Sequence, residues 1–246
     1  MVPTKTRGRS GAIAKLALAV AVIASTCAVA RADGGRSEVG RLGRFTITKT
    51  DAPPEVLARG RAANQATLMT QAVLERSNIK EIRGYREFLR KSARLDRAAQ
   101  LAAVNDYVAQ HVRVTADANL YQGNDVWAPP INTLTVGGDC EDIALVKSWG
   151  LKYMGFPAKD LFLVVGVTSN VTPPEGHAVL VARLPDGGFY VLDNTDRRIL
   201  RLEDAKGFEP GYAINSFGYW EVDDPNRSYG DFWRQAFKTS ADRHAR

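Results

Sequence analysis

The sequence contains little cysteine and little histidine. Two cysteines and three histidines occur among its 246 residues, so the side chains most often used for thiol and imidazole chemistry are few. It has neither an internal repeat nor a low-complexity segment, and its basic residues are scattered among acidic ones. A surface of mixed charge without a basic stripe gives no indication of a nucleic-acid partner, and none is expected.

The first thirty residues have the composition of a signal peptide. Basic residues precede an apolar run from Leu16 to Ala24, and Ala28 to Ala30 fits the A-x-A cleavage pattern. Cleavage is expected near Ala30 or Ala32, which places the mature protein in the periplasm or beyond. An uncleaved membrane anchor is the alternative, but the run is shorter than the roughly 20 residues that a bilayer requires. No stable membrane insertion is therefore expected after cleavage.

Removal of this leader changes the charge and the number of thiols. The leader holds four basic and no acidic residues, so the 33 Lys and Arg of the whole chain fall to 29, against 27 Asp and Glu. It also holds Cys27, which leaves Cys140 as a single thiol in an oxidising compartment. A single exported thiol is either an inert buried side chain or a reactive group. About 210 residues remain, which is enough for one sizeable core.

Apolar periodicity predicts helices before Cys140. Apolar residues recur at three- and four-residue steps from Leu101 to Val112, which is typical of a helix packed on a core. A shorter helical pattern covers residues 56–76. The paired prolines at 129 and 130 favour an extended, loop-like path between these helices and the cysteine.

The stretch around Cys140 predicts a loop that opens into a helix. Asp139 is a good N-cap and Gly155 is a stop signal, so a helix is expected from Cys140 to Met154. Strand-like runs follow at residues 161–167, 177–184 and 189–192, and turn residues between the last two predict a hairpin. The pattern indicates an α+β fold, with the cysteine helix packed on an antiparallel sheet.

The acidic neighbours of Cys140 oppose its ionisation. A helix N-terminus favours the thiolate that attacks a substrate, whereas the negative charges of Asp139, Glu141 and Asp142 raise the pKa of a thiol. A hard cation such as Ca²⁺ would neutralise these acids and fix the loop. Asp139 and Asp142 share a helix face, while Glu141 points elsewhere unless the first turn is irregular. Ordinary acidity at a helix start, without a metal, is the alternative.

A cysteine nucleophile also needs a base. His244 lies in the charged tail, and His111 follows the apolar face of its helix, where core packing is expected. His177 opens a strand and is the best candidate for the base. Asp193, at the end of the next strand, is expected to orient the His177 ring.

The hairpin register sets a condition for that arrangement. A simple loop that pairs Leu184 with Phe189 would place Asp193 opposite Leu180 and not opposite His177. A bulge or an offset register is therefore required to bring the carboxylate to the imidazole.

A series of short motifs runs through the second half of the chain. They are Val126-Trp-Ala-Pro, Thr133-Leu, Gly138-Asp-Cys-Glu-Asp, Lys147, His177-Ala-Val-Leu and Val191-Leu-Asp-Asn. In kind and order they resemble those of the bacterial transglutaminase-like cysteine peptidases of the LapG type, a branch of the papain-like and transglutaminase superfamily. The resemblance covers about residues 101–220 and implies a papain-like or transglutaminase-like core.

The resemblance also implies a catalytic triad and a calcium site. The nucleophile, the general base and the orienting carboxylate of the triad are Cys140, His177 and Asp193. The acids that match the family's calcium-binding residues are Asp139, Glu141 and Asp142. The implied activity is a calcium-dependent cysteine endopeptidase that forms a thioester acyl-enzyme.

Asn132 and Trp127 belong to the segment that precedes the cysteine loop. The family usually has a glutamate where this chain has Asn132, so a charge near the site is missing. The change affects either calcium binding or only a hydrogen bond of the loop. Trp127 is a recognition residue or a core anchor, and burial is expected for a tryptophan flanked by prolines.

The resemblance further suggests partners. Its best understood members release large surface adhesins, and so act on biofilms, under control of an inner-membrane cyclic-di-GMP receptor. A protein substrate is therefore expected, with an adhesin and such a receptor as candidate partners. Two alternatives stay open: an acyl transferase that passes the thioester to an amine, and a non-catalytic periplasmic binding protein. A redox sensor would lack the usual resolving cysteine.

These features divide the chain into four segments. They are a signal peptide (1–30), an N-terminal extension (31–78), a transglutaminase-like cysteine peptidase domain (79–225) and a C-terminal tail (226–246).

Overall fold

The computed structural model describes residues 39–121, 125–168 and 174–223. They fall in the unit of the chain that begins at Ser37. The predicted signal peptide with its cleavage site, the predicted tail and His244 lie outside the described residues. Within the described ranges, no helix combines the length and the apolar character needed to cross a membrane.

Some helix ends coincide with capping signals in the sequence, although the predicted N-cap Asp139 forms no capping hydrogen bond through its side chain. α3 begins after Asp96, whose carboxylate accepts a hydrogen bond from the Ala99 N–H at 2.9 Å. α6 begins after Asp139 and ends before Gly155, whose φ of 87° favours glycine. The helices are α1 (Pro54–Arg76), α2 (Lys80–Ser92), α3 (Arg97–His111), α4 (Asp117–Leu120), α5 (Pro130–Val136) and α6 (Cys140–Tyr153).

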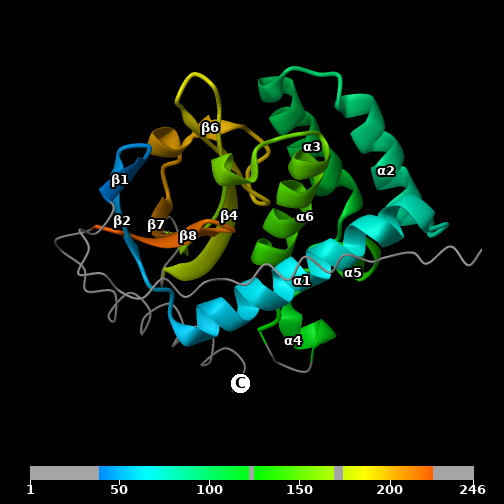
Figure 1. Cartoon of the computed structure of the whole chain (residues 1–246), viewed down its shortest axis with the longest axis horizontal. Coiled ribbons are helices and arrows are strands. Elements are labelled where there is room, and N and C mark those ends of the chain that lie inside the picture. The colour runs from blue at the N-terminus through cyan, green and yellow to red at the C-terminus, as the bar shows by residue number, and fades with distance from the viewer. Residues whose placement is uncertain (1–38, 122–124, 169–173, 224–246) are drawn as a thin grey trace, which may run out of the picture. The chain divides into compact units, whose positions relative to one another are not determined.

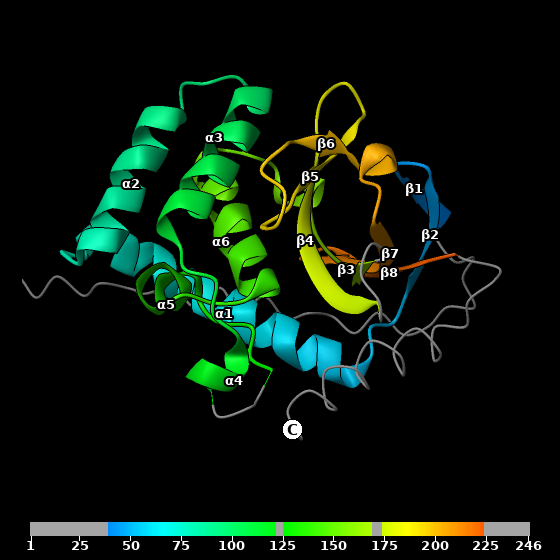
Figure 2. The ribbon, with the colours of Figure 1, turned by 180° about the vertical axis from the view of Figure 1, so that it is seen from behind.

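Eight strands form one sheet in the order β1-β2-β8-β7-β3-β4-β5-β6, and every neighbouring pair is antiparallel. The helices lie beside this sheet (Figures 1 and 2), which confirms the predicted α+β fold. The strands are β1 (Val39–Leu42), β2 (Phe45–Thr50), β3 (Leu161–Thr168), β4 (Glu175–Arg183), β5 (Phe189–Leu192), β6 (Leu200–Arg201), β7 (Phe208–Asn215) and β8 (Gly218–Val222), with single 3₁₀ turns η1 (Ala158–Asp160) and η2 (Leu202–Asp204).

The core consists of two apolar clusters on the two faces of the sheet. Along β4 the side chains alternate: Ala178, Leu180 and Ala182 join the cluster that includes the helices, whereas Val179 and Val181 join the other. α6 contributes Ile143 and Trp149, among others, to the helical cluster. The helix that begins with Cys140 is therefore fixed against the strand that carries His177, as predicted for the cysteine helix.

The stretch predicted as an N-terminal extension contributes to the same sheet and core. β2 pairs with β8, and Thr48 donates a hydrogen bond to Asp223 at 3.0 Å. Val56 and Leu74 of α1 are buried in the helical cluster. We therefore propose that the catalytic unit begins at β1 and not at residue 79.

Two local predictions were wrong. Pro130 does not lengthen the loop but begins α5, because proline at the first helical position lacks only an N–H that the helix would leave unpaired. His111 is exposed and not packed in the core. It is the last residue of α3, and its ring stacks on Tyr107 one turn earlier, with centroids 4.0 Å apart, while Val112 takes the buried place.

Gly150 of α6 is required by a close approach to α2. The buried Tyr85 hydroxyl donates to the Val146 carbonyl at 2.9 Å, and a Cβ at residue 150 would lie 2.1 Å from that hydroxyl. Gly150→Ala is therefore expected to lower the free energy of unfolding by roughly 1–3 kcal/mol, measured by urea titration. The control Gly60→Ala, whose Cβ would lie 3.5 Å from Ile214, should raise it by about 0.5–1 kcal/mol. Equal stabilities for the two variants would contradict the packing argument.

Candidate active site

The loop before α6 is tied to a neighbouring strand-like segment. Gly138 accepts a hydrogen bond from the Thr115 N–H at 2.9 Å and donates one to the Arg113 carbonyl at 3.2 Å. Gly137 has a φ of 94°, and a Cβ there would lie 2.5 Å from the Arg113 oxygen. The loop thus needs glycine at this position, and its path places Cys140 as the first residue of α6.

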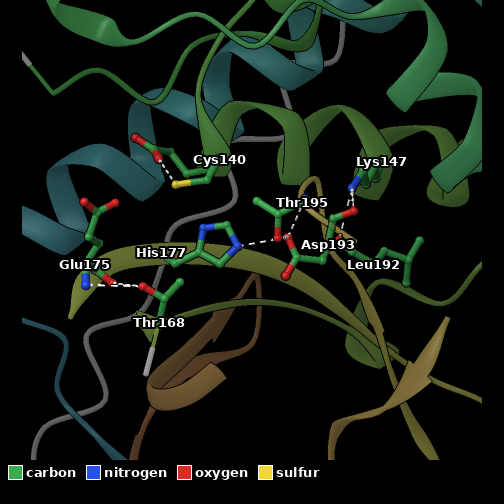
Figure 3. Close-up of polar contacts among 9 residues, drawn as sticks. Cys140, Lys147, Thr168, Glu175, His177, Leu192, Asp193 and Thr195 are labelled. Atoms are coloured by element: carbon green, nitrogen blue, oxygen red, sulfur yellow. Dashed lines mark hydrogen bonds and ion pairs between the residues drawn. The ribbon is translucent and has the colours of Figure 1, made fainter. Parts of the chain in front are cut away.

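The hairpin of β4 and β5 brings His177 and Asp193 together. Its three-residue loop is closed by a hydrogen bond from the Leu184 N–H to the Gly188 carbonyl, so Leu180 pairs with Leu192. Asp193 consequently lies opposite Val179, one residue from the position that a simple loop would give. From there its Oδ1 is 2.9 Å from Nε2 of His177 (Figure 3).

Asp193 is held as an anion by several donors. Its Oδ1 accepts hydrogen bonds from the Thr195 N–H at 2.8 Å and the Thr195 hydroxyl at 2.9 Å. Burial raises the pKa of Asp193, but the hydrogen bond and charge of His177 and the bonds from Thr195 outweigh it and lower the pKa to about 2. His177 itself is buried, and its ring meets the Phe208 ring edge-on at 5.9 Å between centroids.

Cys140 lies across from the imidazole. Figure 3 shows the ring of His177 below Cys140, with the nitrogen that does not contact Asp193 turned toward the sulfur. The thiol donates a hydrogen bond to Oε2 of Glu141 at 3.2 Å. Burial raises the pKa of Cys140, the charges of Glu141 and Asp139 raise it further, and a hydrogen bond from the Ala178 N–H lowers it. Burial and the neighbouring acids thus both raise the pKa of the thiol, and the effect of the acids is the one that their position in the sequence predicts.

Acidic side chains gather beside the cysteine in a larger cluster than the sequence suggested. The predicted Asp139, Glu141 and Asp142 do not meet as one group of three. Instead, carboxylate oxygens of Asp139 and Asp142 lie within 4.8 Å of one another and of Asp117, and those of Glu141, Asp117 and Asp125 do the same. The acidic cluster is defined here as these five residues.

Several oxygens of the acidic cluster have no partner. Asp117 Oδ1, Asp139 Oδ1 and Asp142 Oδ2 are buried without a hydrogen bond from any described residue. Asp142 is fully buried, and burial raises its pKa to about 7 and that of Asp117 to about 6. Ordinary helix-start acidity would leave these carboxylates in solvent. Buried carboxylate oxygens without donors fit a hard cation such as Ca²⁺, which takes oxygen ligands.

Three members of the acidic cluster are held in place by neighbouring segments. Asp117 and Asp142 each accept a 2.6 Å hydrogen bond from a backbone N–H of that loop, from Val126 and Ala128 respectively. Asp125 forms a 3.0 Å ion pair with Arg59 of α1. Asp117 and Asp125 were missed from the sequence because they precede Cys140 by many residues, and no local pattern shows that the chain returns them to the start of α6.

The two loop residues singled out by sequence have different surroundings. Trp127 is 6% exposed and belongs to the helical core, which confirms its expected burial. Asn132 is exposed on α5 and hydrogen-bonds to the Tyr121 side chain.

The fold and the order of these residues can be compared with known proteins. A family model described as bacterial transglutaminase-like cysteine proteinase matches residues 82–208, more than half of the chain. The chain belongs to this family. It is accordingly a cysteine peptidase with a transglutaminase-like fold. No curated protein sequence matches it.

Solved structures agree with this family in their fold. Calcium-bound LapG of Legionella pneumophila is 21% identical, covers 70% of this chain and 98% of its own, and has a TM-score of 0.54. EGTA-treated LapG of the same organism is 22% identical, covers 65% of this chain and 88% of its own, and has a TM-score of 0.55. At such identities the likeness shows the shared fold alone.

Proposed function

We propose that this transglutaminase-like cysteine peptidase is a periplasmic endopeptidase that hydrolyses a protein substrate through Cys140, His177 and Asp193. The observation that carries the proposal is the 2.9 Å hydrogen bond between Nε2 of His177 and Oδ1 of Asp193, which leaves Nδ1 of the same ring turned toward the thiol at the start of α6. A nucleophile, a base that faces it and a group that orients the base are what covalent amide hydrolysis requires.

The proposed reaction proceeds in two halves. Nδ1 of His177 takes the thiol proton, and the sulfur of Cys140 attacks the carbonyl carbon of the scissile amide. The Cys140 N–H donates to the oxyanion, since the first N–H groups of a helix have no partner within the helix. The imidazolium then gives its proton to the leaving amine as the C–N bond breaks, which leaves a thioester. In the second half His177 removes a proton from water, which attacks the thioester and releases the acid and the thiol.

The acidic cluster supplies the ligands for calcium in this proposal. Asp139, Glu141 and Asp142 would hold the ion together with Asp117 and Asp125, and the ion would neutralise negative charge beside the thiol. Its support is the set of buried carboxylate oxygens without donors. Related structures are described as calcium-bound and EGTA-treated LapG, which agrees with a calcium site in this fold. The Asn132 side chain forms a hydrogen bond with the Tyr121 side chain.

The proposed location rests on the signal peptide, and the proposed substrate rests on the family resemblance. The signal peptide of residues 1–30 supports export to the periplasm. The proposed substrate is a large surface adhesin of a biofilm, and the proposed regulator is an inner-membrane cyclic-di-GMP receptor, both on the family resemblance.

Product analysis separates hydrolysis from acyl transfer. Digestion of an unfolded protein mixture in H₂¹⁸O, with and without an added primary amine, is expected to give new C-termini that carry ¹⁸O in both cases, because water resolves the thioester. Mass spectrometry reads the label, and Cys140→Ala provides the uncleaved control. New C-termini that carry the amine and no ¹⁸O would instead identify an acyl transferase.

A further inference from the structure

Lys147 is a buried lysine whose amino group donates hydrogen bonds to the backbone at Asp193. Its side chain is 1% exposed. Nζ donates a hydrogen bond to the Leu192 carbonyl at 3.1 Å and another to the Asp193 carbonyl at 2.9 Å (Figure 3). Removing a lysine from water is costly, so its burial calls for a specific partner.

The place of Lys147 on α6 connects two members of the proposed triad. It follows Cys140 by seven residues, which is about two helical turns and the same helix face. The same face of α6 therefore carries the thiol at its first residue and, two turns later, the Lys147 side chain that binds the end of β5. The two carbonyls that Lys147 binds belong to the last residue of β5 and to Asp193 itself.

The backbone of Asp193 needs such an anchor because β5 ends before it. β5 pairs with β4 only as far as Leu192, so the pairing recorded for that strand stops one residue before the carboxylate. The Asp193 side chain is held by Thr195 and His177, whereas its carbonyl is held by Lys147. Lys147 thus links the cysteine helix by hydrogen bonds to the residue whose carboxylate orients the imidazole.

We propose that Lys147 is a positioning residue for the proposed peptidase reaction: by binding the Leu192 and Asp193 carbonyls it sets the Asp193 carboxylate, and through it the His177 ring, against the thiol carried by the same helix. The inference rests on the triad proposed above. Lys147 touches neither substrate nor thiol, so its effect on catalysis passes through Asp193. Burial lowers the pKa of Lys147 to about 7, and the charge of Asp193 acts in the opposite direction and raises it.

The test is a double-mutant cycle with Asp193. Lys147→Met keeps the apolar stem and removes both hydrogen bonds; it is expected to lower kcat by about 100-fold with KM within about twofold, because a misplaced catalytic group costs rate more than binding. In an Asp193→Ala background, the same change should lower kcat less than about twofold, since there is no carboxylate left to position. The matched control is Lys152→Met, an exposed lysine of the same helix, which should leave kcat unchanged.

A second readout does not depend on activity. The His177 Nε2 proton bonded to Asp193 should give a downfield proton resonance in wild-type protein, assigned by its loss in His177→Asn. Lys147→Met, or Lys147→Gln if the methionine variant does not fold, should shift or broaden that resonance. Lys152→Met should not.

The outcomes separate this inference from the proposed function. An unchanged kcat and resonance in Lys147→Met, or an equal loss of kcat in the wild-type and Asp193→Ala backgrounds, overturns the positioning role. Cleavage that persists in Cys140→Ala overturns the proposed function instead, and the resonance then still decides whether Lys147 sets the contact between Asp193 and His177.

Discussion

Cys140→Ala is expected to lower the rate of peptide-bond cleavage by roughly 10⁶-fold, because the bond-forming atom is removed. His177→Ala should cost nearly as much, since burial and the charges of Glu141 and Asp139 raise the pKa of the thiol and His177 is the imidazole turned toward it. Both rates would be measured on the same protein substrate by quantifying new N-termini. Folding of each variant is checked by its thermal unfolding.

Different replacements of Asp193 are expected to lower the activity by different amounts. Asp193→Ala leaves Nε2 of His177 without a partner and is expected to lower kcat by roughly 10⁴-fold. Asp193→Asn should retain more activity, because an amide oxygen can still accept the imidazole N–H, as in enzymes with a Cys-His-Asn arrangement. Asp196→Ala, a change in the same loop at a carboxylate that pairs with exposed Arg198, should have wild-type activity. Full activity in Asp193→Ala would refute the proposed triad.

Removal of calcium is the second change that is expected to lower the cleavage rate strongly. A chelator is expected to lower the cleavage rate by about 100-fold or more, because the carboxylates of the acidic cluster would then repel one another beside the thiol. Added Ca²⁺ should restore the rate, whereas Mg²⁺ should not, since it requires a tighter octahedral set of ligands. Cleavage assays across a calcium titration check both statements.

Stability provides an independent readout of the same site. At a calcium concentration of about 100 times the dissociation constant, binding should add about 2.7 kcal/mol to the free energy of unfolding and raise Tm. Asp142→Asn and Asp117→Asn should abolish this shift, whereas Asp204→Asn, an exposed acid far from the cluster in sequence, should keep it. A wild-type Tm and rate that are the same in calcium and in chelator would rule out the proposed site.

Local signals in the sequence were sufficient for the elements that end in capping or turn residues. The helix after Asp139 begins at Cys140 as predicted and ends at Tyr153, one residue early, with Gly155 just beyond. The strand predicted at 189–192 is β5 without change, and the other two runs correspond to β3 and β4. Each of these is fixed by contacts within a few residues, which a sequence pattern records directly.

The parts of the fold and of the site that were not predicted depend largely on contacts between distant segments. β1, β2, β7 and β8 were not predicted. The β1–β2 and β7–β8 hairpins are local, but the pairing of β2 with β8 and of β7 with β3 joins segments far apart in the chain. Asp117 and Asp125 entered the acidic cluster in the same way, through a loop whose path no local pattern fixes. The contact between His177 and Asp193 depended on a one-residue difference in a hairpin, and only the loop of three residues with Gly187 at a φ of 79° decides it.

The pairing of β2 with β8 has a consequence for the order of folding. β2 comes before every helix, and β8 is the last described strand. The hydrogen-bonding edge of β2 that faces β8 cannot be filled until almost the whole polypeptide has been synthesised, and closing so long a loop is slow. Chaperones that hold the nascent chain open would therefore assist this protein more than one built from neighbouring hairpins, and a chain cut short before residue 218 would leave that edge open to pair with another molecule.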